Sequence, residues 1–339
     1  MILVTGGTGL IGSHLLYEIT SNNHLVRAIK RSGSNTQNVL KIFGYYSENP
    51  EALFNKIQWV DSDLTDYFSL HTAFEDIERV YHCAGLVSFN RRKKNTLFNT
   101  NVTGTSNIVN LSLEKSIKKL CFVSSIASFG EYDGNIAVDE TTRWKPDKKC
   151  SFYSLSKLKA EMEVWRGIAE GLDAVIINPS VVLGPGFWNN GVGHVFRMVS
   201  RGFRFYTHGS TGYIDVRDVA KIMVMLMESD ISGEQFLLSS ENLSFKEILT
   251  LISGSIDGKK PDIHVNRFLS GISWRISSLV SFITRREPIL TRDNARISNK
   301  HSVYSGKKLQ DRLNYKYIDI RETVRFLAEK YNTEYNKGK

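Results

Sequence analysis

Residues 2–12 read Ile2-Leu3-Val4-Thr5-Gly6-Gly7-Thr8-Gly9-Leu10-Ile11-Gly12. A short apolar run, typical of a β-strand, leads into glycines at every third position, and a helical pattern follows over residues 10–21. In such a turn Gly6 permits the tight bend, Gly9 lets the backbone approach a pyrophosphate, and Gly12 lets the helix pack closely on the strand. The start of the helix then offers amide donors and a favourable dipole to phosphates.

This pattern predicts a dinucleotide-binding site, because a strand precedes the glycines, a helix follows them and a second strand comes at the expected distance. The alternative is a strand-to-helix turn that binds nothing. The candidate cofactor-binding residues of the turn are Gly6, Thr8, Gly9, Leu10, Ile11 and Gly12.

Beyond the turn, short β-branched runs alternate with longer helical patterns. Strands are predicted at residues 2–5, 24–30, 57–61, 79–83, 119–124 and 173–178, and helices at residues 10–21, 66–76, 98–114 and 151–169. Such alternation is typical of a parallel sheet with crossover helices. We therefore predict an α/β fold, a Rossmann-type doubly wound parallel sheet with a smaller C-terminal substrate lobe.

The domain division follows from where the alternation loosens, near Pro179. Residues 1–180 are predicted to form the cofactor-binding domain and residues 181–330 the substrate-binding lobe, with some segments of the lobe returning to the first domain. In the lobe we expect a helix from about Val219 to Met227, introduced by Asp218. Residues 331–339 are predicted to be a frayed tail.

The composition is that of a globular protein, with 339 residues, 41% of them hydrophobic and 23% charged. Disordered and collagen-like classes are therefore excluded. No apolar stretch reaches the roughly 20 residues that a membrane span needs, and the start of the chain lacks the pattern of a secretory signal. We expect the protein to stay in the cytoplasm. The cysteines Cys83, Cys121 and Cys150 lack Cys-x-x-Cys spacing, so neither a disulfide framework nor a metal site is predicted.

The net charge of +9 lies in the C-terminal part, because residues 257–339 hold 18 Lys and Arg against 9 Asp and Glu. A solvated basic surface is the favoured interpretation, with an anionic partner as the alternative. Apolar residues at helical spacing over 268–283, followed by Arg285-Arg286, would either dock on anionic lipid or, as we favour, pack against the substrate lobe. No nucleic-acid-binding module is recognisable. A membrane-surface contact and a homodimer stay open.

The end of the second strand indicates which nicotinamide cofactor is bound. A carboxylate there accepts from the ribose 2′-hydroxyl of NAD, whereas a cation accommodates the 2′-phosphate of NADP. The chain reads Val26-Arg27-Ala28-Ile29-Lys30-Arg31, and no Asp or Glu occurs between Glu18 and Glu48. Arg31 can offer a planar fork to phosphate oxygens. We therefore predict NADP(H), with NAD(H) disfavoured; the alternative is that Lys30 and Arg31 are merely solvated.

The fourth strand ends in Tyr81-His82-Cys83-Ala84-Gly85. The small residues Ala84 and Gly85 would let the cofactor lie against the backbone. His82 is interpreted as a strand histidine rather than a catalytic base.

The predicted catalytic residues are Ser125, Tyr153 and Lys157. Ser125 stands at the end of the fifth strand, and Tyr153-Ser154-Leu155-Ser156-Lys157 opens an amphipathic helix. Residues four apart share a helix face, so we expect the Lys157 ammonium near the Tyr153 phenol, where it would lower the phenol pKa and make Tyr153 a usable acid or base. The same spacing at Tyr335 and Lys339 lies outside the cofactor domain and lacks this context.

Together these motifs resemble the short-chain dehydrogenase/reductase superfamily, and the resemblance runs from Ile2 to about Ala220. Residues 178–186, Asn178-Pro179-Ser180-Val181-Val182-Leu183-Gly184-Pro185-Gly186, are similar to the loop by which extended members contact the nicotinamide carboxamide, which adds Pro179 and Val182 to the cofactor candidates. Residues 26–31 look most like the dihydroflavonol reductase and 3β-hydroxysteroid dehydrogenase branch of the NAD-dependent epimerase/dehydratase family.

The resemblance also implies roles for single residues. In the family, an Asp at the position of Asp63, followed here by Leu64, hydrogen-bonds the adenine amino group; on the sequence alone, a turn Asp is the favoured interpretation. Ser125 is preferred to Ser124 because residues 126–130 resemble the segment after the family's catalytic Ser or Thr. Asn101 matches a recurring Asn that supports the site, although a helix residue bonding the backbone is an equal alternative.

We therefore expect an NADP(H)-dependent oxidoreductase that reduces a carbonyl, or oxidises an alcohol, of a small organic substrate. Ser125 would donate to the carbonyl oxygen, Tyr153 would protonate the alkoxide, and Lys157 would hold the nicotinamide ribose. Two alternatives stay open: a nucleotide-sugar epimerase with tightly bound NAD, and a dinucleotide-sensing regulatory protein. Sugar-nucleotide 4,6-dehydratases are disfavoured because Ile126-Ala127 stands where they carry an Asp-Glu pair.

Overall fold

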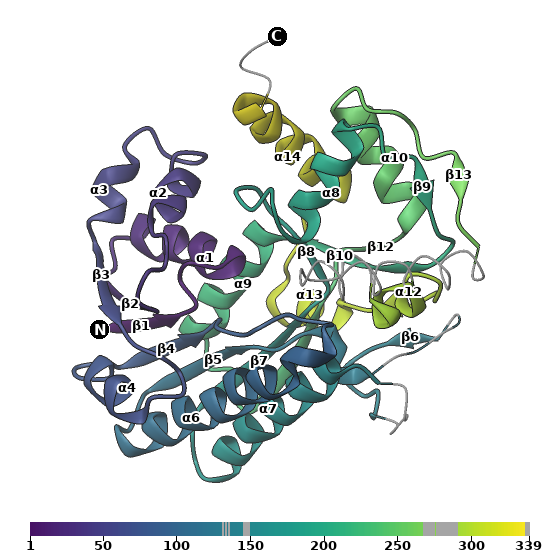
Figure 1. Ribbon diagram of the computed structural model, residues 1–339. Helices are drawn as coiled ribbons and strands as arrows, with labels where there is room; N and C mark the ends of the chain where they lie inside the picture. Colours follow the sequence, from purple (N-terminus) through teal and green to yellow (C-terminus); the bar gives the residue numbers. More distant parts are fainter. Residues whose placement is uncertain are drawn as a thin grey trace.

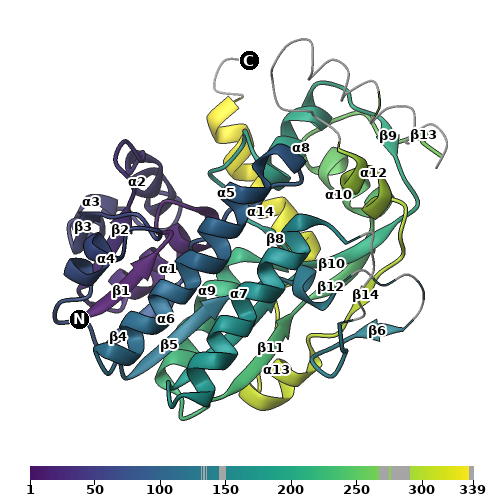
Figure 2. The same ribbon diagram turned by 60° about the horizontal axis from the view of Figure 1, so that its bottom comes forward.

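The main sheet of the protein has seven strands in the order β11-β7-β5-β4-β1-β2-β3 (Figure 1; β11 is labelled in Figure 2). The computed structural model describes residues 1–130, 132, 134, 136–144, 150–266, 275 and 291–335. All pairings in the sheet are parallel. Its strands are β1 (Ile2–Thr5), β2 (Val26–Lys30), β3 (Ile57–Asp61), β4 (Arg79–His82), β5 (Lys119–Val123), β7 (Ala174–Pro179) and β11 (Glu234–Leu238). This is the predicted Rossmann-type fold.

Helices cover both faces of this sheet. One face carries α1 (Leu10–Ser21) and α9 (Val216–Glu228), and the other carries α4 (Tyr67–Ala73), α6 (Gly104–Glu114) and α7 (Phe152–Ala169). Figure 2 shows α6 and α7 lying side by side across their face. Along β5, Cys121 and Val123 pack in the first core while Leu120 and Phe122 pack in the second. Burial on both faces explains why the strands read as nearly unbroken apolar runs.

The glycine turn between β1 and α1 depends on two close backbone approaches. Gly6 has φ +69°, a left-handed conformation that side chains disfavour, and a Cβ placed on it would lie 2.7 Å from Ala84 Cα. A Cβ on Gly12 would lie 2.2 Å from the Gly6 carbonyl oxygen. The turn therefore fastens α1 to β1 and to the end of β4 at the same point.

The smaller lobe is built mostly from the C-terminal part of the chain. Its sheet has the order β12-β10-β8, and it packs with α8, α10 and α14 around a separate core that contains Trp188, Phe196 and Tyr331. Short strand pairs, β9 with β13 and β6 with β14, flank it. The bounds are β6 (Ala137–Val138), β8 (Val181–Leu183), α8 (Gly191–Ser200), β9 (Phe205–Tyr206), β10 (Ser210–Asp215), β12 (Glu241–Ser244), α10 (Phe245–Ser255), β13 (Ile263–His264), α12 (Arg292–Ile297), β14 (Val303–Tyr304), α13 (Lys307–Leu313) and α14 (Ile320–Tyr335).

Several segments beyond residue 180 return to the main sheet. β11 pairs with β7 as the edge strand, α9 packs on α1, and Leu309 of α13 joins the core on that face. α14 continues to Tyr335, so the first five residues of the predicted frayed tail are helical. The predicted apolar helix over 268–283 lies outside the described residues.

The six predicted strands are present with ends within two residues of the predicted ones, and other details differ. The predicted helix over 98–114 is α5 (Lys94–Phe98), a π-helical turn at Asn99–Thr103, and α6. The short helices α2 (Gln37–Phe43) and α3 (Pro50–Phe54) were not predicted; they fill the link between β2 and β3 and pack on α1.

The cap assigned to α9 was wrong. α9 begins at Val216, and Asp215 caps it by accepting from the Arg217 backbone amide. Asp218 lies inside the helix and instead accepts hydrogen bonds from the Tyr315 hydroxyl and the Ile318 amide. The carboxylate at Asp218 therefore holds the segment before α14 rather than the start of α9.

None of the helices in the described ranges is both long enough and apolar enough to cross a membrane.

The Gly12→Ala substitution should lower the free energy of unfolding by about 1–3 kcal/mol, because its methyl group meets backbone atoms that cannot rotate away. The measurement is urea unfolding followed by circular dichroism. The matched control is Gly254→Ala in α10, where an added Cβ meets no atom within 4 Å and alanine favours the helix. Equal unfolding midpoints for the two variants would contradict the close approach at Gly12.

Candidate functional site

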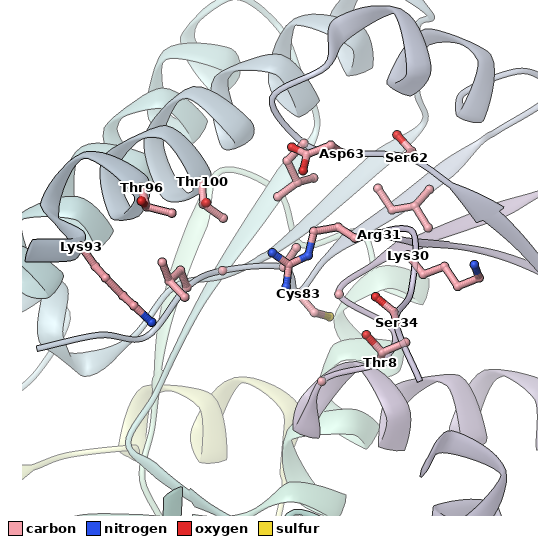
Figure 3. Close-up of a pocket in the computed structure, with 17 residues that line it drawn as sticks. Thr8, Lys30, Arg31, Ser34, Ser62, Asp63, Cys83, Lys93, Thr96 and Thr100 are labelled. Atoms are coloured by element: carbon pink, nitrogen blue, oxygen red, sulfur yellow. The ribbon is translucent and has the colours of Figure 1, made fainter. Parts of the chain in front are cut away.

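A cavity of about 570 Å³ opens at the carboxyl ends of β1, β2, β3 and β4 (Figure 3). The sheet order reverses between β1 and β4, which is where open α/β sheets bind ligands. The cavity is lined by Gly6, Thr8, Gly9, Ile29, Lys30, Arg31, Ser34, Ser62, Asp63, Leu64, Cys83, Ala84, Gly85, Leu86, Lys93, Thr96 and Thr100. Eight of the predicted cofactor residues are therefore brought together: Gly6, Thr8, Gly9, Arg31, Asp63, Leu64, Ala84 and Gly85.

Two neighbouring cations at the end of β2 have different surroundings. Lys30 forms an ion pair with Asp61, its register partner on β3. Arg31 is exposed, and its side chain extends into the cavity between Asp63 and Cys83 (Figure 3). No ion pair or hydrogen bond within the described structure engages its guanidinium. Arg31 is thus the cation of this pair that is available to an anionic ligand.

Asp63 is held in a turn of its own. Its carboxylate accepts from the Thr65 amide at 2.8 Å and the Thr65 hydroxyl at 2.6 Å, and these bonds, assisted by the charge of Arg31, lower its pKa. These contacts are those that the interpretation of Asp63 as a turn Asp predicts. Asp63 also lines the cavity, so the turn places an ionised carboxylate at its wall.

The start of α1 faces this cavity without a side-chain cap. Gly9 precedes the helix with extended backbone, and no side chain among the described residues bonds the first-turn amides. Those amides and the helix dipole suit an anion such as a pyrophosphate. Leu10, Ile11 and Gly12 belong to this first turn but do not line the cavity.

Tyr153 lies in the first turn of α7, where the hydroxyl of Ser151 caps the helix by accepting from the Ser154 amide at 3.0 Å. The Tyr153 side chain lies near that of Ser125, two residues beyond the end of β5. Burial raises the pKa of the Tyr153 phenol, and the neighbouring Ser125 side chain opposes this rise. The ring of Phe89 packs edge-on against Tyr153 with centroids 5.6 Å apart.

Lys157 lies one helical turn beyond Tyr153 and is 5% exposed. Its Nζ donates to the Val123 carbonyl at 2.8 Å, and a Cβ on Gly85 would lie 3.7 Å from it, so the amine sits beside the cavity wall. Burial lowers the pKa of Lys157 to about 8, against opposing effects of Glu161 and Cys83. The expected lowering of the Tyr153 pKa by Lys157 is wrong for this structure, because burial dominates and Lys157 is not among the groups that shift it.

Ser124 and Ser125, which follow β5, contact different partners. Ser124 donates to a Glu161 carboxylate oxygen at 2.8 Å, whereas Ser125 meets Tyr153. The carbonyl of Ser125 accepts from Asn178 Nδ2 at 3.1 Å. The geometry therefore brings Ser125, Tyr153 and Lys157 together and separates Ser124 from them.

Asn101 lies in the π-helical turn and is 2% exposed. Its Oδ1 accepts from the Leu86 amide at 2.7 Å, and its Nδ2 donates to the Leu86 carbonyl at 3.0 Å and to the Ser156 hydroxyl at 2.9 Å. The Asn101 side chain thus forms hydrogen bonds with the backbone, as one of the two interpretations of the sequence predicts. These bonds also join the strand end at Gly85 to the helix of Tyr153.

His82 is a buried link in a polar chain and not a base. Its Nδ1 lies 2.7 Å from Thr5 Oγ1 and its Nε2 lies 3.0 Å from Thr105 Oγ1. Thr105 donates to the Asn101 carbonyl and Thr5 accepts from the Ala84 amide, so the network assigns the proton to Nε2. Burial lowers the pKa of His82 to about 3, which keeps the ring neutral.

The segment from Pro179 to Gly184 passes close to the start of α1, beside the glycine turn. Pro179 ends β7, and Val182 lies in β8, which leads to Gly184. A Cβ on Gly184 would lie 2.9 Å from the Leu10 side chain, so this segment passes the first turn of α1. Neither Pro179 nor Val182 lines the described cavity.

Sequence reasoning missed several lining residues. Ser34 and Leu86 lie within four residues of predicted strand ends and could have been added by extending those motifs. Lys93, Thr96 and Thr100 come from the α5 region, and no spacing in the sequence indicated them.

The sequence pattern of the NAD dependent epimerase/dehydratase family matches residues 2–238. The chain belongs to that family. A Synechocystis protein provisionally named dihydroflavonol 4-reductase is 26% identical over 329 residues, covering 95% of this chain and 91% of its own. Cinnamoyl-CoA reductase 1 of Petunia hybrida is 27% identical over 263 residues, covering 75% of this chain and 76% of its own.

Solved structures show the same fold. The crystal structure of gox2253 has a TM-score of 0.81 at 25% identity, over 99% of this chain and 98% of that one. The NAD complex of UDP-glucose 4-epimerase from Thermus thermophilus has a TM-score of 0.74 at 19% identity, over 98% of each chain. As an epimerase/dehydratase family member, the chain is an enzyme of the extended short-chain dehydrogenase/reductase type, a group that binds a nicotinamide dinucleotide.

Replacing His82 should flatten the acid side of the stability profile of this epimerase/dehydratase family member. The folded pKa of about 3 lies below the unfolded value of roughly 6.5, so protons bind the unfolded chain first and stability falls as the pH drops below 6.5. Between pH 7 and pH 5 this single residue should cost about 2 kcal/mol of unfolding free energy. Urea unfolding of His82→Gln at a series of pH values should lack that part of the slope.

The control for this measurement is His24→Gln, because His24 is exposed in the turn before β2. That variant should keep the slope of the unaltered protein. Parallel profiles for His82→Gln and the unaltered protein would contradict a neutral, buried His82.

Proposed function

We propose that this protein is an NADP(H)-dependent oxidoreductase that reduces the carbonyl, or oxidises the alcohol, of a small organic substrate. The observation that carries the proposal is the placement of Tyr153 near Ser125, with the amine of Lys157 one turn away on α7 and beside Gly85 at the cavity wall. A proton donor, a carbonyl-orienting hydroxyl and a cation thus stand next to a site suited to a dinucleotide.

The residues around the cavity fit a dinucleotide. Gly6 and Gly9 line the cavity without side chains, the uncapped start of α1 offers amides to phosphates, and Arg31 offers a cation. When bound, the nicotinamide supplies or accepts a hydride.

In reduction, the Ser125 hydroxyl donates to the substrate carbonyl oxygen, and the Tyr153 phenol gives its proton to that oxygen as negative charge develops there. Burial suits Tyr153 to this task, because a raised pKa keeps the phenol protonated at neutral pH. Lys157 has donors besides the one that bonds Val123, and these would hold ribose hydroxyls of the cofactor.

The names of two relatives support carbonyl reduction over epimerisation. One is provisionally named a dihydroflavonol 4-reductase and the other is a cinnamoyl-CoA reductase. The choice of NADP(H) rests on Arg31, which projects into the cavity, whereas Lys30 forms an ion pair with Asp61. A guanidinium binds a 2′-phosphate through two parallel hydrogen bonds.

The first test is a screen of carbonyl compounds and UDP-sugars with NADPH and NADH, followed by absorbance at the nicotinamide band and by analysis of sugar products. We expect NADPH oxidation with carbonyl compounds. Epimerisation of a UDP-sugar without net cofactor change, turnover with NADH alone, or dinucleotide binding without any turnover would each contradict the proposal.

Tyr153→Phe should reduce kcat at least a hundredfold, because it removes the proton donor, while the affinity for NADPH stays nearly unchanged. Steady-state kinetics and fluorescence titration with NADPH measure the two effects. The control is Tyr335→Phe, which removes the same hydroxyl from an exposed side chain at the end of α14. Full activity of Tyr153→Phe would rule out the assigned acid.

Arg31→Asp should weaken NADPH binding roughly ten- to a hundredfold and NADH binding much less, because a charge-assisted bond to phosphate is lost and repulsion is added. Kd values for the two cofactors measure the difference. Arg201→Asp carries the same charge reversal on an exposed residue after α8 and should leave both values unchanged. An equal effect of Arg31→Asp on both cofactors would refute phosphate recognition by Arg31.

A further inference from the structure

The reaction described above assigns no role to one buried carboxylate beside the site, that of Glu161. Glu161 is 6% exposed and lies on α7 one turn beyond Lys157. Its Oε2 accepts from Ser124 Oγ and from Asn178 Nδ2, both at 2.8 Å, and its Oε1 accepts from Gln235 Nε2 at 2.8 Å. These donors are all neutral, so they solvate the carboxylate without cancelling its charge.

The charge of Glu161 acts on Lys157. The titratable groups that interact with Lys157 within the described ranges are His82 at the end of β4, Cys83 directly after that strand, and Glu161 on α7. Tyr153 lies one helical turn earlier on α7. From β5 the amine meets the Val123 carbonyl and the face of the Phe122 ring, with its centroid 4.8 Å away.

Of those titratable groups, Glu161 is the one that most strongly favours the ammonium form of Lys157. Burial keeps His82 neutral by lowering its pKa, and it keeps the thiol of Cys83 and the phenol of Tyr153 protonated by raising theirs. The buried Glu161 carboxylate, one turn along α7, is therefore the neighbour best placed to offset the desolvation of the Lys157 amine.

The same carboxylate also anchors the turn of Ser125. Asn178 Nδ2, which donates to Glu161, donates as well to the Ser125 carbonyl at 3.1 Å and to Ser128 Oγ at 2.8 Å. The hydroxyl of Ser124 is held by Glu161 directly. Strand β11 contributes Gln235, whose Nε2 also donates to Asn178 Oδ1 at 2.9 Å and so fixes the orientation of that amide.

We propose that Glu161 is a positioning residue of this site: its buried negative charge keeps Lys157 in the ammonium form, and its bonds to Ser124 and Asn178 hold the turn that presents Ser125. The consequence for catalysis rests on the proposed function, whereas the effect on the charge of Lys157 does not. A lysine that lost this neighbour would release its proton at lower pH, so activity that needs the ammonium would be lost earlier as the pH rises.

The test is a titration of Lys157 by NMR of protein labelled with carbon-13 at lysine Cε, its signal assigned by its loss in Lys157→Met. In the unaltered protein we expect a midpoint near pH 8. In Glu161→Gln the midpoint should fall by about one unit, and the alkaline limb of kcat/KM against pH should move down with it. Glu161→Asp, which keeps the charge, should restore most of both shifts.

Two controls separate charge from structure. Glu163→Gln makes the same change two residues along α7, where the carboxylate bonds Arg166 and Ser106, and it should leave the Lys157 midpoint in place. Ser124→Ala breaks one bond of the Glu161 network but keeps the charge, so it should lower the melting temperature without moving the midpoint. A shift in Ser124→Ala as large as that in Glu161→Gln would overturn the proposal.

The remaining outcomes are also decisive. An unmoved midpoint in folded Glu161→Gln would overturn the proposal. If that variant does not fold, the unaltered protein still decides, because a Lys157 midpoint below pH 7 would mean that Glu161 does not keep it charged. Absence of any turnover in the unaltered protein would contradict the proposed reductase function and leave the titration result standing.

Discussion

The contact between the glycine turn and its surroundings is the constraint on which the site depends. The Gly6 backbone lies so close to Gly12 and to Ala84 that a single Cβ at either glycine would overlap other backbone atoms. This closeness brings the first turn of α1, the end of β1 and the end of β4 to one place, and the cavity opens there. The polar chain through Thr5, His82 and Thr105 extends the same junction to Asn101. Because every donor and acceptor in that chain is neutral and paired, the junction carries no buried charge that would loosen it.

Much of this could be predicted from the sequence where the signal is local. The strands are short apolar runs buried on both faces, and the glycine turn follows β1 directly, so both were found close to their observed bounds. The Tyr153 and Lys157 pair is one helical turn apart, which spacing alone fixes. Helices α2 and α3 were missed because each is short, and packing on α1 rather than their own periodicity stabilises them. The cap of α9 was missed because Asp215 and Asp218 are equivalent in sequence, and only the fold decides which one lies inside the helix.

Other features depend on residues that are distant along the chain. The surroundings of Glu161 combine β5, α7, β7 and β11, and no window of sequence contains them all. The electrostatics of Tyr153 likewise depend on how deeply the phenol is buried, which overrides the expectation drawn from Lys157. Lys30 and Arg31 are adjacent and alike in sequence, yet the pairing of β2 with β3 gives one a carboxylate partner and leaves the other facing the cavity. Tertiary structure thus distinguishes residues that the sequence presents as equals.

The edge strand β11 has a consequence for how the chain folds during its synthesis. Its residues follow the first strands of the smaller lobe, yet they complete the sheet of the larger one by pairing with β7 and by supplying Gln235 to Asn178. While the polypeptide emerges from the ribosome, the backbone groups along one side of β7 therefore wait without a strand partner until residue 238 has been made. A fragment cut near residue 180 would expose that open edge to other chains, so the two lobes are better regarded as one cooperative folding unit than as separable modules.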